Sequence, residues 1–148
     1  MPVATDAELE AFVAAFDDFV RAAKRARARV ETEAVLSPSQ YDLLAPLAGG
    51  AVLGRRALAR AAGVSAPTAT RMLDGLQARG LVTRERSADD RRAVRLGLTP
   101  EGADAVAAAH ERMVARRRAL FEQLDPGERR AAAKVLAQLA GAYDRVQG

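Results

Sequence analysis

The stretch G-V-S-A-P-T-A-T-R-M-L-D-G-L, residues 63–76, decides the fold of this 148-residue chain. Gly63 is suited to a left-handed turn, because a glycine adopts that backbone conformation at little cost. Ser65 is a favoured helix N-cap, and Pro67 follows it in the first helical turn. The apolar residues that come next share one helical face, and they are Ala69, Met72, Leu73 and Leu76. The stretch therefore predicts a tight turn followed by a helix with one buried face.

A short helix over about 55–62 is predicted just before this turn, so the two helices form a helix-turn-helix pattern. At 100° per residue, Pro67, Arg71 and Asp74 lie opposite the apolar face of the second helix. In such motifs the N-terminal half of the second helix reaches base edges in the major groove. Ser65 has a capping role whether or not it also contacts DNA. The DNA contacts predicted for this helix are Ser65, Pro67, Thr68, Thr70 and Arg71.

After Gly80 the apolar period changes from that of a helix to that of a strand. Two strands are predicted, over 81–86 and 93–98, with residues 87–92 connecting them. In the second strand Val94, Leu96 and Leu98 are expected to face inward. The sequence therefore predicts a small β-hairpin directly after the helix-turn-helix.

Further helices are predicted on both sides of this unit. The first covers 6–33 with apolar residues at helical spacing. S-P-S-Q at 37–40 is a capping box that begins a second helix, which is expected to end at Gly49-Gly50. Thr99-Pro100 begins a helix to about 122, with Ala103, Val106, Ala107, Met113, Val114, Leu120 and Phe121 on one stripe. A capping box at Asp125 and Glu128 begins the last helix.

The helices at the two termini are too long to bury their apolar stripes on a central unit of roughly 60 residues. They can bury these stripes against one another and against a second copy of the chain. A twofold-symmetric dimer would place two recognition helices about 34 Å apart, one turn of B-DNA. The organisation thus predicts a homodimer.

Positive charge is concentrated in the centre of the chain. Residues 55–95 hold ten arginines against four acids, a net charge of +6, whereas the whole chain has a net charge of +4. A basic segment within an otherwise acidic chain is typical of a polyanion-binding protein. Arg55 and Arg56, at the start of the first motif helix, either reach DNA phosphates or are simply exposed.

Other classes of protein are disfavoured by what the sequence lacks. It has no Cys and one His, so no disulfide framework, thiol chemistry, metal site or cofactor is expected. No glycine-rich phosphate loop or catalytic pair is evident, which argues against an enzyme. No apolar run approaches the ~20 residues of a membrane span, and no secretory pattern opens the chain. A cytoplasmic protein with no membrane partner is expected.

The order of several motifs resembles the MarR family of winged-helix regulators. These motifs are L-S-P-S-Q-Y-x-x-L (36–44), G-V-S-x-P-T-x-T-R-x-x-x-x-L (63–76), G-L-V-x-R (80–84), D-R-R (90–92) and L-x-L-T-x-x-G (96–102). The resemblance implies a mainly α fold with a small β-hairpin wing (α+β), in which dimerisation helices flank a winged helix-turn-helix. We expect an N-terminal dimerisation helix over 1–34, a DNA-binding lobe over 35–99 and C-terminal dimerisation helices over 100–148.

The same resemblance implies a homodimeric transcription factor, usually a repressor, that binds an imperfect palindrome of double-stranded DNA. The family's wing motif, Asp-x-Arg, falls on Asp90 and Arg92. A hairpin can present arginine at its tip to a narrow minor groove, and Arg91 and Arg92 are the candidates for insertion. We assign Asp90 to bracing the wing, because a carboxylate facing phosphate would repel it. Arg84, Arg86 and Arg95 on the strands are expected to contact the DNA backbone.

Family members are often released from DNA by a small, frequently aromatic, ligand. In this chain His110 and Arg117 could line a pocket for an acidic effector, with Phe16, Phe19 and Tyr41 as aromatic walls. The alternative is that His110 lies in the dimer seam and that the three rings pack in the core. A constitutive or architectural winged-helix protein without any effector is the alternative function.

Overall fold

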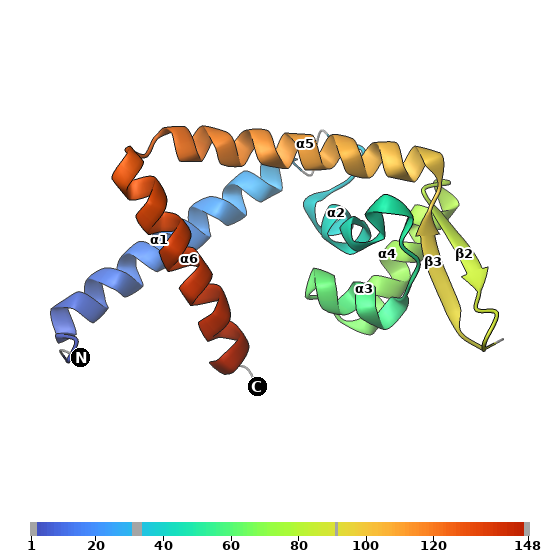
Figure 1. Ribbon diagram of the computed structural model, residues 1–148, viewed down its shortest axis with the longest axis horizontal. Helices are drawn as coiled ribbons and strands as arrows, with labels where there is room; N and C mark the ends of the chain where they lie inside the picture. The colour runs from blue at the N-terminus through green and yellow to red at the C-terminus, as the bar shows by residue number, and fades with distance from the viewer. Residues whose placement is uncertain (1–2, 31–33, 91, 147–148) are drawn as a thin grey trace. The chain divides into compact units, whose positions relative to one another are not determined.

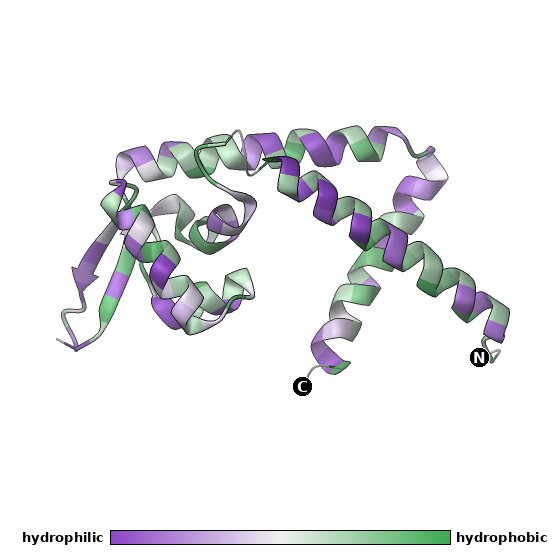
Figure 2. Cartoon of the chain, turned by 180° about the vertical axis from the view of Figure 1, so that it is seen from behind, coloured by the Kyte–Doolittle hydropathy of each residue, from purple (hydrophilic) through white to green (hydrophobic). Residues whose placement is uncertain are grey.

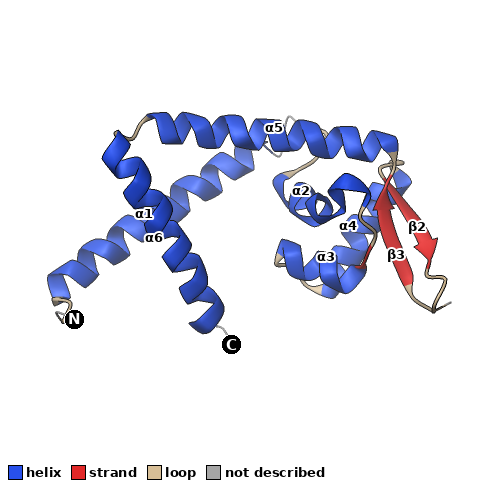
Figure 3. Cartoon of the chain, in the orientation of Figure 1, coloured by secondary structure: helices blue, strands red, loops and turns tan. Residues whose placement is uncertain are grey.

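The computed structural model describes residues 3–30, 34–90 and 92–146 (Figure 1). The chain divides into two compact units, Met1–Ala109 and His110–Gly148. Helices dominate both units, and a small antiparallel sheet lies in the first (Figure 3). The predicted class, mainly α with a β-hairpin, is confirmed.

The helix-turn-helix of the first unit forms as its sequence predicts. Helix α3 (Arg55–Ala62) ends at Gly63, whose φ of 64° is the left-handed conformation expected there. Helix α4 (Ala66–Ala78) begins after Ser65, whose Oγ accepts a hydrogen bond from the Thr68 N–H at 3.3 Å. The capping and turn residues therefore fix where each helix of the motif begins and ends.

The chain preceding the motif departs from prediction at one point. Helix α2 (Pro38–Leu44) begins with the predicted capping box, in which Ser37 and Gln40 bond each other's backbone N–H groups. It ends at Leu44 and is followed by 3₁₀ turns over Ala45–Gly50 that a kink at Ala48 and Gly49 interrupts, so the predicted end of one α-helix at Gly49-Gly50 is wrong. Pro46 explains the change, because it has no N–H to continue the α-helical hydrogen bonds.

The sheet has three strands in the order β1-β3-β2, all antiparallel. Strands β2 (Val82–Arg86) and β3 (Val94–Leu98) are the predicted hairpin, and β1 (Leu53–Gly54) adds to the free edge of β3. The prediction that Val94 faces inward is wrong, because it is 38% exposed. It pairs with Arg86 at the outer end of the hairpin, beyond the part of β3 that β1 covers.

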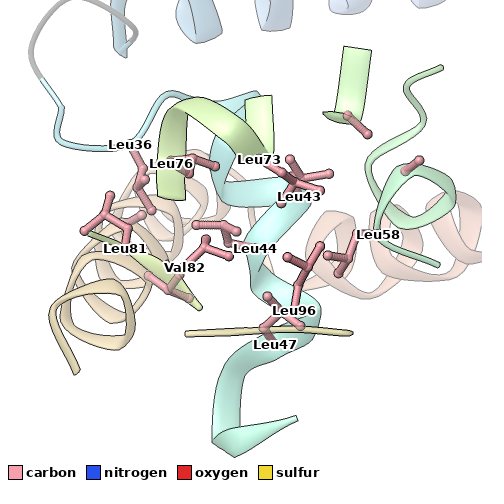
Figure 4. Close-up of a cluster of buried hydrophobic side chains, with 14 residues drawn as sticks. Leu36, Leu43, Leu44, Leu47, Leu58, Leu73, Leu76, Leu81, Val82 and Leu96 are labelled. Atoms are coloured by element: carbon pink, nitrogen blue, oxygen red, sulfur yellow. The ribbon is translucent and has the colours of Figure 1, made fainter. Parts of the chain in front are cut away.

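A leucine cluster forms the core of the first unit (Figure 4). Its members come from α2, the 3₁₀ turns, α3, α4, the sheet and the start of α5 (Pro100–Glu122), together with the residues just before α2 and β2. Each fully buried leucine contributes about 1.5–3 kcal/mol of hydrophobic free energy relative to an exposed one. The side chains less than 2% exposed are Leu36, Leu43, Leu44, Leu47, Leu58, Leu73, Leu76 and Leu96. This core holds the helix-turn-helix and the hairpin in one lobe.

Helix α5 (Pro100–Glu122) begins against this lobe. Its buried residues are Gly102, Val106 and Ala109, whereas Ala103 and Ala107, which the sequence places on one stripe with Val106, are exposed. The reason is a close backbone approach at Leu81, whose carbonyl oxygen lies 1.9 Å from where a Cβ on Gly102 would be. That approach turns the Gly102 face of the helix, and not its Ala103 face, toward the lobe.

Helices α1 (Asp6–Val30) and α6 (Pro126–Val146) contain no buried residue. Green, hydrophobic segments run along both of them in Figure 2. The large apolar side chains left exposed on these two helices are Leu9, Phe12, Val13, Phe19, Val135, Leu136, Tyr143 and Val146. The predicted capping box of α6 forms, with Asp125 and Glu128 bonding each other's backbone N–H groups. No described helix combines the length and hydropathy that a membrane span requires.

Candidate nucleic-acid interface

The N-terminal half of α4 presents an outward polar surface. Ser65, Pro67 and Arg71 are exposed, and Thr68 and Thr70 are half-buried. The Ser65 hydroxyl donates to Thr68 Oγ1 at 2.9 Å, which leaves the hydroxyl proton of Thr68 to donate elsewhere. The structure thus brings all five predicted residues of this helix to its first two turns.

The electrostatics of this helix end favour an anion. The first turn of α4 contains no acidic residue, and the N-terminus of a helix carries a partial positive charge. Arg71 lies one turn further along and has no ion-pair partner among the described residues. A phosphate or a base acceptor approaching α4 from this side meets hydroxyl groups, a positive helix end and a guanidinium.

The tip of the β2–β3 hairpin is braced by Asp90. Its carboxylate accepts a hydrogen bond from the Arg92 backbone N–H at 2.9 Å, and its backbone carbonyl accepts from Ala93 N–H at 3.0 Å. The Ser87 N–H closes the loop by donating to the Ala93 carbonyl at 3.1 Å. Asp90 thus holds the backbone beside Arg92. Arg92 itself is exposed, and Arg91 lies outside the described residues.

The other predicted arginines occupy different surroundings. Arg86 is exposed at the end of β2, and Arg95 is exposed opposite Glu85 in the adjoining strand. Arg84 forms an ion pair with Asp74 of α4, so its charge already has a partner within the lobe. Arg55 is half-buried at the start of α3, with an Nε that has no hydrogen-bond partner among the described residues.

The residues predicted to line an effector pocket belong to both units. Phe16 is half-buried, 5.8 Å from Phe12 between ring centroids, and Phe19 is 59% exposed. Tyr41 packs against the leucine core. His110 and Arg117 are exposed on the α5 segment of the second unit. There Val114, Arg117, Arg118 and Phe121 line an open depression. The pocket remains a prediction.

Sequence reasoning missed two residues that position the interface. Gly102 permits the close approach of α5 to Leu81, and Thr99 Oγ1 fixes the same junction by donating to the Gly80 carbonyl at 2.6 Å. The T-x-x-G spacing places both on one helical turn and could have indicated a packing role. Helical periodicity correctly placed Asp74 on the outward face of α4. Its ion pair with Arg84 of β2 could not be predicted in this way, because no local sequence pattern connects the two elements.

Comparison with known proteins identifies the lobe. The model of the MarR family matches residues 36–94, which include the second helix, the helix-turn-helix, strand β2 and the loop that follows it. A Thauera aromatica protein, provisionally named a transcriptional regulatory protein for the hcr operon, is 30% identical over 117 residues. The match covers 79% of this chain, and this chain spans 66% of the length of that protein.

Solved structures agree with the family match. The transcriptional repressor CouR, bound to a 23-mer DNA duplex, is 33% identical with a TM-score of 0.66, over 80% of this chain and 89% of its own. Streptococcus pneumoniae FabT in complex with DNA shares the fold at 17% identity with a TM-score of 0.74, over 96% of this chain and 99% of its own. With the predicted motifs in place on the predicted fold, the chain belongs to the MarR family of transcriptional regulators.

Proposed function

We propose that this protein is a homodimeric, sequence-specific DNA-binding regulator that represses transcription from operators with twofold symmetry. The observation that carries the proposal is the first two turns of α4, where exposed and half-buried polar groups and Arg71 lie at a helix N-terminus whose first turn has no acidic residue. Its action on DNA is consistent with the predicted cytoplasmic location.

In the proposed complex α4 enters the major groove and the hairpin follows the adjoining minor groove. Thr68, Thr70 and Arg71 are the candidates for base contacts, because they lie at the part of the helix that reaches base edges. Arg92, exposed beside the braced tip, is the candidate for minor-groove insertion. Arg86, exposed at the end of β2, is the candidate for a phosphate contact.

Dimerisation is supported by the apolar surface of the terminal helices. Phe19 on α1 and Leu136 on α6 are both more than half exposed, and neither helix contains a buried residue. Exposed apolar side chains on each of these helices are typical of a protein–protein contact. A second copy of the chain is the partner proposed, because a closed twofold dimer also supplies the second recognition helix that an operator palindrome needs.

Repression is supported by a relative. CouR, which is 33% identical over most of this chain, is a transcriptional repressor bound to DNA. Occupation of an operator by a dimer excludes other proteins from the same DNA, so repression needs no further surface than the one proposed.

Selection of bound duplexes from a random-sequence pool tests this function. Wild-type protein is expected to enrich an imperfect palindrome with half-sites about one helical turn apart. Arg71→Ala is expected to bind more weakly and to relax the preferred sequence, whereas Arg130→Ala on α6 serves as the charge-matched control. Failure of the wild-type protein to enrich any sequence would contradict the proposal.

Release of the protein by a small aromatic acid is the regulatory part of the proposal. It rests on the family resemblance together with His110 and Arg117. Thermal-shift measurements against a panel of aromatic acids, followed by operator binding with each stabilising compound, test it. If no compound raises the melting temperature or weakens operator binding, the constitutive alternative holds.

A further inference from the structure

The ion pair between Asp74 and Arg84 connects the recognition helix to the hairpin. Asp74 lies in the third turn of α4, and Arg84 lies in the middle of β2, opposite Leu96. The Arg84 side chain is 36% exposed and the Asp74 side chain 54% exposed, so the pair lies at the surface of the lobe. Its position makes it part of the face that α4 presents outward.

Asp74 has a charge of the wrong sign for that face. It lies three residues after Arg71 and seven after Pro67, so all three project from the same side of α4. A bare carboxylate there would repel DNA phosphates approaching the helix. Arg84 supplies the opposite charge directly to this carboxylate, and the pair as a whole is neutral.

We infer that Arg84 is a positioning residue that acts by neutralising Asp74, and that it makes no phosphate contact of its own. The inference rests on the proposed function and divides its arginines into two groups. Arg86, two residues along the same strand, has no ion-pair partner among the described residues. Its guanidinium is therefore free to bind a DNA phosphate. Arg84 acts on DNA through Asp74.

The exposure of the pair makes this division testable. Exposed ion pairs add little to folding stability, so substitutions at either position are expected to leave the lobe folded. Under this inference, a decrease of DNA affinity in Arg84→Gln comes from the Asp74 carboxylate, which has lost its ion-pair partner. Removal of that carboxylate should restore the affinity. If Arg84 bound a phosphate directly, removal of the Asp74 carboxylate would not replace that bond.

The experiment compares a single and a double variant of the full-length protein with the wild type. Affinity for one duplex selected by the wild type is measured by fluorescence anisotropy at several salt concentrations. Arg84→Gln is expected to weaken binding roughly 3- to 20-fold. Asp74→Asn/Arg84→Gln is expected to bind within about threefold of wild type, with the wild-type salt dependence, because the neutral pair is replaced by two neutral side chains.

Arg86→Gln is the matched control, since it removes the same charge from the same strand. It is expected to lower the slope of log affinity against log salt by about 0.9, the value for one phosphate contact. Far-ultraviolet circular dichroism melts of all the variants check that each is folded.

The result that overturns the inference is a double variant whose affinity is nearer to that of Arg84→Gln than to wild type, with a salt slope reduced as in Arg86→Gln. That outcome would make Arg84 a phosphate-binding residue while leaving the proposed function intact. If the wild-type protein binds no duplex, the proposed function itself fails, and the role assigned to Arg84 fails with it.

Discussion

The lobe around α4 and the terminal helices use their apolar residues in opposite ways. The lobe buries eight leucines almost completely within one chain. Helices α1 and α6 are longer than any of the lobe helices α2, α3 and α4, yet no residue of either is buried. The lobe therefore has a core of its own, whereas the terminal helices leave large apolar side chains exposed. Under the proposed function a second copy of the chain covers them. Stability of the lobe and assembly of the protein should accordingly respond to different substitutions.

The largest expected effect is at the junction between the lobe and α5. In Gly102→Ala the new Cβ would lie 1.9 Å from the Leu81 carbonyl oxygen, so backbone must move. We expect a decrease of about 3–5 kcal/mol in the free energy of unfolding, measured by urea denaturation. Gly75→Ala is the control: a Cβ there meets nothing within 4 Å, and a helix interior favours alanine. Equal stability of the two variants would contradict the close packing at Gly102.

The next effect separates assembly from lobe stability. Leu136→Glu places a charge on the exposed apolar face of α6, where Leu136 is 57% exposed. We expect the dimer dissociation constant, measured by sedimentation, to rise by about two orders of magnitude, or roughly 2.7 kcal/mol. Gln138→Glu adds the same charge at an exposed polar position of the same helix and should leave assembly unchanged. Identical dissociation constants for these two variants would remove α6 from the interface.

A smaller effect is expected at the tip of the hairpin. Arg92→Ala removes an exposed guanidinium from the tip. The Asp90 carboxylate holds the backbone of this residue by accepting a hydrogen bond from its N–H. Operator affinity is expected to fall by about 1–3 kcal/mol, with a weaker salt dependence, in anisotropy titrations. Because Arg92 contributes nothing to the leucine core, the melting temperature should not change. Operator affinity equal to that of the wild type at fixed salt would show that the tip does not contact DNA.

The smallest effect concerns the start of α1. The Thr5 backbone N–H and then its hydroxyl donate hydrogen bonds to Glu8, and these lower the pKa of its carboxyl below the usual value. A lowered pKa stabilises the folded form above the pKa of the unfolded chain, and this stabilisation is lost as pH falls through the folded pKa. Nuclear magnetic resonance titration should show the first turn of α1 loosening only in acid. An ordinary Glu8 pKa would show that this cap does not form in solution.

Local signals predicted the fold of the lobe well. Ser65, Gly63 and the S-P-S-Q box act within one helical turn, so their caps and turns formed where the sequence placed them. Strand β1 was missed because two residues carry no alternation and depend on the edge that β3 offers. The contact of α5 with the lobe through Gly102 was missed for a similar reason, since it depends on the approach of Leu81.

The candidate site shows the same limit. Helical periodicity predicted the candidate DNA contacts of α4, and the spacing of the wing motif predicted the bracing role of Asp90. All of these residues are exposed or half-buried in the structure. The partner of Arg84 does not follow from either, because Asp74 and Arg84 come together only when β2 packs beside α4. Pairings of this kind required the three-dimensional structure.

Sedimentation of the wild-type protein, free and mixed with its selected duplex, tests the central claim most directly. We predict a species of twice the chain mass without DNA, and a complex of two chains on one duplex with two half-sites. A monomer that binds one half-site at micromolar concentration, or a dimer with no affinity for DNA, would contradict this prediction.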